Sequence, residues 1–166
     1  IDAAATGAIQ GLKLALNIGA VLLAFISLVA MFNALVAWTG SLFGVETLSL
    51  QEILGYLFQP VAYLMGVPWS EATQAGSLIG EKIIINEFVA FIDFMSRVDT
   101  LSEKTQVIVT FALCGFANLG SIAVVIGGMG ALAPTRRREL SKLGLKAVLA
   151  GSLAKLLGAC IAGIFF

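Results

Sequence analysis

Four side chains in two apolar stretches of the sequence have the chemistry to bind a polar solute: Glu87, Phe116, Asn118 and Ser121. Glu87 lies in IIINEFVAF, among large apolar residues. An ionised carboxylate only accepts hydrogen bonds, and its two oxygens can accept from two neighbouring hydroxyl groups together. A sugar diol is therefore a natural ligand for Glu87. The alternative is a structural ion pair with Lys82 or Lys155.

The other three residues lie in ALCGFANLGS, residues 112–121, within a long stretch that carries no charge. Asn118 and Ser121 are three residues apart and share a face of any regular helix, whereas Phe116 points away from that face. All three can contact one ligand only if the helix is unwound here, which the glycines of this stretch favour. The alternative leaves Asn118 and Ser121 bonded to neighbouring helices and Phe116 in the core.

The composition of the chain is that of an integral membrane protein. Of its 166 residues, 59% are hydrophobic and 12% are charged, and the mean hydropathy is +1.00. The net charge is zero and the sequence has no histidine, so no basic surface for nucleic acid and no imidazole ligand or proton relay is expected. The sequence offers no nucleophile with a base and an orienting residue, which argues against an enzyme. No metal or cofactor site is expected within this chain.

The hydropathy pattern predicts an all-α membrane protein with about three transmembrane helices, one interfacial helix and one re-entrant helical hairpin. Charged residues divide residues 70–97 into apolar pieces of about a dozen residues or fewer, which are too short to cross a bilayer. The predicted elements are a transmembrane helix within residues 1–40, an interfacial helix at 48–66, the re-entrant hairpin at 70–97, a broken transmembrane helix at 105–133 and a final transmembrane helix at 141–166.

Local signals refine these elements near the charged residues. Asn86 is expected to cap the second helix of the hairpin, whose positive end then lies beside Glu87. Asp93 and Arg97 have the spacing of a helical ion pair. The basic run at residues 136–138 is expected to lie in a loop, which the positive-inside rule places in the cytoplasm.

Three stretches carry a resemblance to a known family: GEKIIINEFVAF at 80–91, ALCGFANLGSI at 112–122 and GGMGALAPTRRREL at 127–140. Together they closely resemble the C-terminal half of concentrative nucleoside transporters, which move nucleosides with a sodium or proton gradient. The resemblance extends over nearly the whole chain, and NEFVA and CGFAN are its most specific parts.

The resemblance implies half of a transporter fold with inverted repeats, in a homotrimer that lies in the plasma membrane, such as a bacterial inner membrane. It implies that Glu87, Asn118 and Ser121 hold the ribose hydroxyl groups and that Phe116 packs against the nucleoside. The coupling cation and the nucleobase would bind in an upstream half. We expect the chain, which begins at Ile1, to be part of a longer protein. The alternative function is a non-transporting membrane subunit with a role in assembly.

Overall fold

The computed structural model describes residues 1–42, 44, 48–122, 125–126 and 134–166. Throughout these residues the regular structure is helical, without strands, which confirms the all-α prediction. The chain forms two units, residues 1–50 and residues 51–166. Part of the predicted broken helix, residues 123–124 and 127–133, lies outside the described residues.

The first unit is built on one long helix, α1 (Asp2–Leu42, 41 residues). Its apolar sequence leaves few polar side chains, and their hydroxyl groups donate to carbonyl oxygens three or four residues earlier in the same helix. The donors are Ser27, Thr39 and Ser41. After the helix, the Leu50 N–H donates to Asn33 Oδ1 at 2.8 Å. These polar groups are thus satisfied within the unit, as an apolar environment requires.

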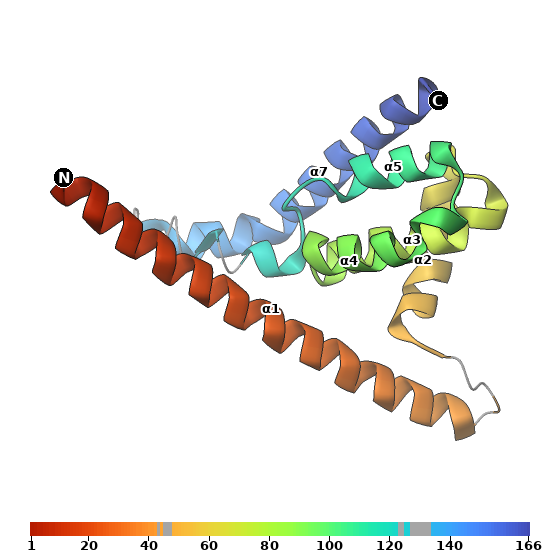
Figure 1. Cartoon of the computed structure of the whole chain (residues 1–166), viewed down its shortest axis with the longest axis horizontal. Coiled ribbons are helices and arrows are strands. Elements are labelled where there is room, and N and C mark those ends of the chain that lie inside the picture. The colour runs from red at the N-terminus through yellow and green to blue at the C-terminus, as the bar shows by residue number, and fades with distance from the viewer. Residues whose placement is uncertain (43, 45–47, 123–124, 127–133) are drawn as a thin grey trace. The chain divides into compact units, whose positions relative to one another are not determined.

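The second unit contains the hairpin and the helices around it. Helix α2 (Leu50–Leu64) leads into α3 (Trp69–Ile84) and α4 (Glu87–Arg97), which contact each other and are joined by two residues. A 3-10 turn (Val98–Thr100) precedes α5 (Glu103–Leu113), which packs along α7, as Figure 1 shows. The core between these helices is made of fully buried aliphatic side chains: Leu78, Ile79, Ile108, Val109 and Leu113.

The last helix, α7 (Arg137–Ile164), follows a short 3-10 turn (Pro134–Arg136). The prediction that the basic segment forms a loop is wrong for most of its length, because the helix begins inside it. Arginine and lysine are good helix formers, and Arg136 forms an ion pair with Glu139 in the first turn. Among the described residues, Arg138–Ile164 of α7 is the one helix long and apolar enough to cross a membrane. The part of α1 that spans Ile26–Leu42 is apolar but shorter.

Glycines bring the backbones of α2 and α3 unusually close together. A Cβ atom at Gly76 would lie 2.7 Å from the Gly55 carbonyl oxygen and 2.8 Å from the Gln59 nitrogen. Both neighbours are backbone atoms, so neither can rotate away. A side chain at this position therefore forces the two helices apart.

We expect Gly76→Ala to destabilise the full-length protein by about 1 to 3 kcal/mol, the usual cost of overpacking. The midpoint of thermal unfolding in detergent measures the effect. Ser70→Ala is the matched control, because Ser70 lies on the same helix with its side chain exposed. Equal midpoints for Gly76→Ala and the control would show that the helices separate at no cost.

Candidate functional site

The tip of the hairpin presents Glu87 at the beginning of a helix. Helix α3 ends at Ile84, and Asn86 is extended (φ −171°, ψ 168°). The Asn86 Oδ1 atom accepts from the Val89 N–H at 2.9 Å, which confirms the predicted cap. Glu87 is the first residue of α4, so its carboxylate lies at the positive end of that helix, which favours an anion.

The second component of the site is an unwound segment after α5. The helix ends at Leu113 and regular helix resumes at Leu119, which confirms the break expected near the glycines. Gly115 has φ +150°, a conformation that residues with a side chain rarely adopt. Unwinding frees backbone groups, and one of them, the Ala117 carbonyl, accepts from Ser152 Oγ of α7 at 3.4 Å.

Lys155 also belongs to the α7 surface that covers the unwound segment. A Cβ atom at Gly115 would lie 2.7 Å from Lys155 Cε and 3.0 Å from its Cγ. The aliphatic part of this exposed lysine therefore lies across Gly115. The absence of a side chain at Gly115 is what allows this contact.

Asn118 connects the two components. Its Oδ1 atom accepts from the Ser121 N–H at 2.7 Å, and the Ser121 hydroxyl donates to the Asn118 carbonyl at 2.7 Å. Asn118 is thus the N-cap of the helical turn that begins at Leu119. Since Oδ1 accepts from a backbone N–H, the amide nitrogen faces outward, and Nδ2 donates to Glu87 Oε2 at 2.8 Å. The structure therefore joins Glu87, Asn118 and Ser121 in one hydrogen-bond network.

The network leaves Glu87 able to accept further hydrogen bonds. Asn118 uses one of about four acceptor positions on the carboxylate. Glu87 is half-buried and Asn118 is only 4% exposed, so the amide holds the carboxylate from its protein side. Two helix beginnings, at Glu87 and at Leu119, contribute their positive ends to the same place. This arrangement offers the remaining lone pairs of the carboxylate to hydroxyl donors.

The alternative of an ion pair at Glu87 does not hold among the described residues. Their ion pairs lie elsewhere, between Asp93 and Arg97 on α4 and between Arg136 and Glu139 at the start of α7. The Asp93–Arg97 pair confirms the ion pair that the spacing of these two residues predicts, and it is partly buried. Lys82 is buried and has Glu87 as a charged neighbour, but the group that contacts the carboxylate directly is the Asn118 amide.

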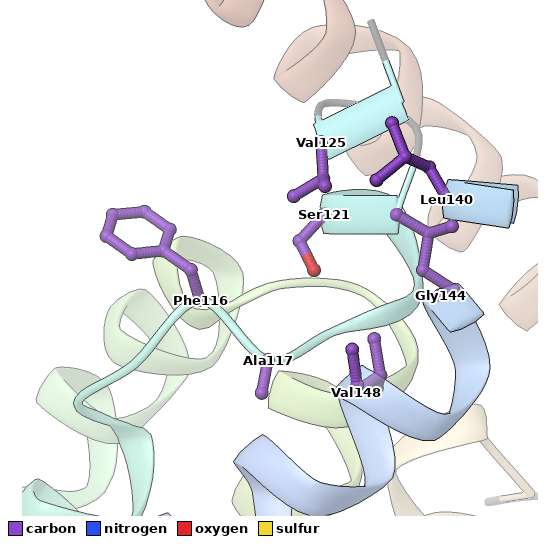
Figure 2. Close-up of a pocket in the computed structure, with 9 residues that line it drawn as sticks. Phe116, Ala117, Ser121, Val125, Leu140, Gly144 and Val148 are labelled. Atoms are coloured by element: carbon purple, nitrogen blue, oxygen red, sulfur yellow. The ribbon is translucent and has the colours of Figure 1, made fainter. Parts of the chain in front are cut away.

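Phe116 lies in the unwound segment and is 79% exposed. Figure 2 shows its ring leaving the segment in a different direction from the side chain of Ala117. It lines the rim of a mainly apolar cavity of about 200 Å³ between the unwound segment and α7. The residues around this cavity are Phe116, Ala117, Ser121, Ile122, Val125, Leu140, Gly144, Ala147 and Val148. Ser121 lines the cavity and also belongs to the hydrogen-bond network with Asn118. That one ligand contacts all four predicted residues stays a prediction.

Two features of the site were not predicted from the sequence. Asn118 and Ser121 were expected to be neighbours on one helix face, although an asparagine three residues after Gly115 is also a typical N-cap. No role was predicted for Ser152, although a serine within an otherwise apolar helix was an available signal. Among the described residues no group of three His, Cys, Asp or Glu side chains is placed to hold a metal ion.

Comparisons with known proteins show which family the chain resembles. The family model described as "Na+ dependent nucleoside transporter C-terminus" matches residues 1–163. The chain is 56% identical to the uncharacterized transporter YutK of Bacillus subtilis, over 99% of the chain and 41% of the relative. It is 49% identical to the nucleoside permease NupC of Helicobacter pylori, over 99% of the chain and 41% of that protein.

Its structure is similar to that of CNTnw in an inward-facing substrate-bound state, with a TM-score of 0.94 and 54% identity, over 99% of this chain and 41% of the other. The chain thus spans about two fifths of the length of the relatives it matches, at their C-terminal part. The all-helical fold, the signature stretches and these matches agree with one another. The chain belongs to the family of concentrative nucleoside transporters, of which it is the C-terminal region.

Proposed function

We propose that the protein containing this region takes up nucleosides across the cytoplasmic membrane by secondary active transport coupled to sodium or protons, and that this region supplies the ribose-binding half of the site. The observation that carries the proposal is the Glu87 carboxylate, held by Asn118 at 2.8 Å where two helices begin. A relative is a nucleoside permease, and a structural neighbour was solved with substrate bound. The first supports nucleosides as the substrate class, and the second supports a substrate site in this fold.

In this proposal the ribose hydroxyl groups donate to the free lone pairs of Glu87. Asn118 keeps the carboxylate in position, Ser121 supports the Asn118 cap, and the exposed Phe116 ring packs against the nucleoside. The hydrogen bond between Glu87 and Asn118 links the hairpin to the unwound segment. The two can therefore move together past a fixed scaffold, as alternating access requires. The full protein would act as a homotrimer in the bilayer, with the coupling cation bound in its upstream half.

A series of uridine analogues tests the role of the diol. We expect uridine to raise the thermal unfolding midpoint of the full-length protein, because a ligand that binds only the folded state stabilises it. We expect 2′,3′-dideoxyuridine to bind at least about a hundredfold more weakly, since it lacks two hydrogen bonds to a charged group, each worth about 1.5 to 3 kcal/mol. Thermal-shift titration at equal coupling-ion concentration measures both.

Uracil and free ribose are the controls, and each should shift the midpoint less than uridine. Equal affinity for uridine and the dideoxy analogue would contradict a ribose site at Glu87. No shift with any nucleoside would instead favour the non-transporting subunit. In that case the hydrogen bonds that Asn118 and Ser121 make with each other would serve assembly alone.

A further inference from the structure

Glu81 is a carboxyl group buried in the first arm of the hairpin, away from the Glu87 tip. Its side chain on α3 is 0% exposed. One oxygen, Oε1, accepts from Gln51 Nε2 of α2 at 2.7 Å, whereas Oε2 is buried and has no hydrogen-bond partner among the residues that the structure describes. An ionised carboxylate that is removed from water and given one neutral donor is strongly disfavoured, and such groups bind a proton instead.

The charged neighbours of Glu81 lie on the second arm of the hairpin. They are Asp93 and Arg97 of α4, and from α2 the neutral Gln51 faces it. On α3 itself, the adjacent Lys82 has Glu87 and Lys155 as its charged neighbours. Arg97 Nε donates to Asp93 Oδ1 at 2.9 Å. Its single positive charge is therefore committed to Asp93, and two carboxyl groups are left with one cation between them.

We propose that Glu81 and Asp93 bind one proton between them, with the Glu81 acid O–H donating to the Asp93 carboxylate. As the donor of this hydrogen bond, Oε2 gains the Asp93 carboxylate as the partner it lacks, and one negative charge is left opposite Arg97. The shared proton then joins α3 to α4, while Gln51 joins α3 to α2. The proton is thus a ligand that holds the arms of the hairpin together.

Removal of this proton would leave two anions side by side, one of them without access to water. Like charges that close repel each other, and the repulsion acts between the two arms. The arms meet at the tip that presents Glu87. Proton release at Glu81 is therefore expected to loosen the hairpin from within, without any change at the Glu87 site itself.

The variant Glu81→Gln tests the proposal, because glutamine has the shape of the protonated acid. Its amide group can donate to Asp93 and accept from Gln51, so the hairpin keeps its contacts without a titrating proton. Glu139→Gln is the matched control, since Glu139 forms an exposed ion pair on α7. Infrared difference spectroscopy of the full-length proteins detects the carbonyl band of a protonated carboxylic acid. Thermal unfolding midpoints at increasing pH provide the second measurement.

We expect the parent and the Glu139→Gln protein to show the acid band and Glu81→Gln to lose it. The unfolded chain releases the Glu81 proton near the ordinary pKa of glutamate, about 4.3, whereas the folded parent keeps it to higher pH. The stability of the parent should therefore fall as pH rises above about 4.3, until the folded protein also loses the proton. This fall should be absent from Glu81→Gln. An unchanged band or an unchanged pH dependence in that variant would overturn the proposal.

The parent protein provides a test that does not depend on the folding of a variant. Absence of the acid band from the parent at neutral pH overturns the proposal directly. A second variant, Asp93→Asn, replaces the acceptor of the proton by an amide that can donate to Glu81, so it should also lose the band. None of these measurements uses a nucleoside, so their failure is distinguishable from failure of the ribose site.

Discussion

Glu87→Gln in the full-length protein is expected to weaken uridine binding by about tenfold to a hundredfold. Hydrogen bonds to a charged group are worth about 1.5 to 3 kcal/mol, and a neutral amide oxygen recovers only part of this. Glutamine keeps the size of the side chain and an acceptor for Asn118 Nδ2, so the fold should be retained. Equilibrium uridine binding and the KM for uptake into proteoliposomes measure the change.

The matched control for this substitution is again Glu139→Gln, which removes one carboxylate from an exposed position on α7. A stronger control compares ligands. Glu87→Gln should lose affinity for uridine and change little toward 2′,3′-dideoxyuridine, because the lost contacts are those with the diol. Ordinary surface substitutions change an equilibrium constant by about twofold or less. A uridine affinity of Glu87→Gln within that range of the parent would rule out the ribose role of Glu87.

Asn118→Asp is expected to separate the two functions of the Asn118 side chain. Aspartate is as good an N-cap as asparagine, so the Ser121 N–H keeps its acceptor and the turn after the break should remain folded. The oxygen that replaces Nδ2, however, would face Glu87 as a second acceptor. Two carboxylates this close cannot both ionise, and one must take up a proton. We expect uridine affinity to fall at least about tenfold, the loss of one charge-assisted hydrogen bond.

Asn118→Ser is the control for that experiment. Serine caps the turn but is too short to bond Glu87, so it removes the donor without adding a charge. Its affinity should lie between those of the parent and Asn118→Asp. If Asn118→Asp binds uridine as well as the parent while remaining folded, the Asn118 amide does not prepare Glu87 for its ligand.

Much of the site could be predicted because its local signals are strong. The hairpin was predictable because charged residues divide its apolar run into short pieces. The Asn86 cap before Glu87 was predictable from helix chemistry alone. The break at Gly115 was likewise predictable from glycine in an otherwise helical stretch. The role of Asn118 was not, because the face it shares with Ser121 was inferred for a continuous helix. Once the helix is broken, Asn118 lies at the beginning of a new turn and its geometry changes.

Features that depend on contacts between distant residues were beyond the sequence. Gln51 and Glu81 are 30 residues apart, and no periodicity indicates that their side chains meet. Burial of Glu81 follows from the approach of α2 to α3, which requires the structure. The start of α7 within the basic segment was missed for a different reason. A cluster of positive charges predicts which side of the membrane it occupies and says little about whether its backbone is helical.

The glycine contact between α2 and α3 restricts how the hairpin can be displaced. At Gly76 the surface of α3 lies against backbone atoms of α2, and at Gly80 it lies against the side chains of Leu54 and Phe58. If α3 slid along α2, a residue larger than Gly76 would be pressed against the α2 backbone. Helix α2 and the first arm of the hairpin, α3, are therefore expected to move as one rigid body. Any displacement of the hairpin during transport would then include α2.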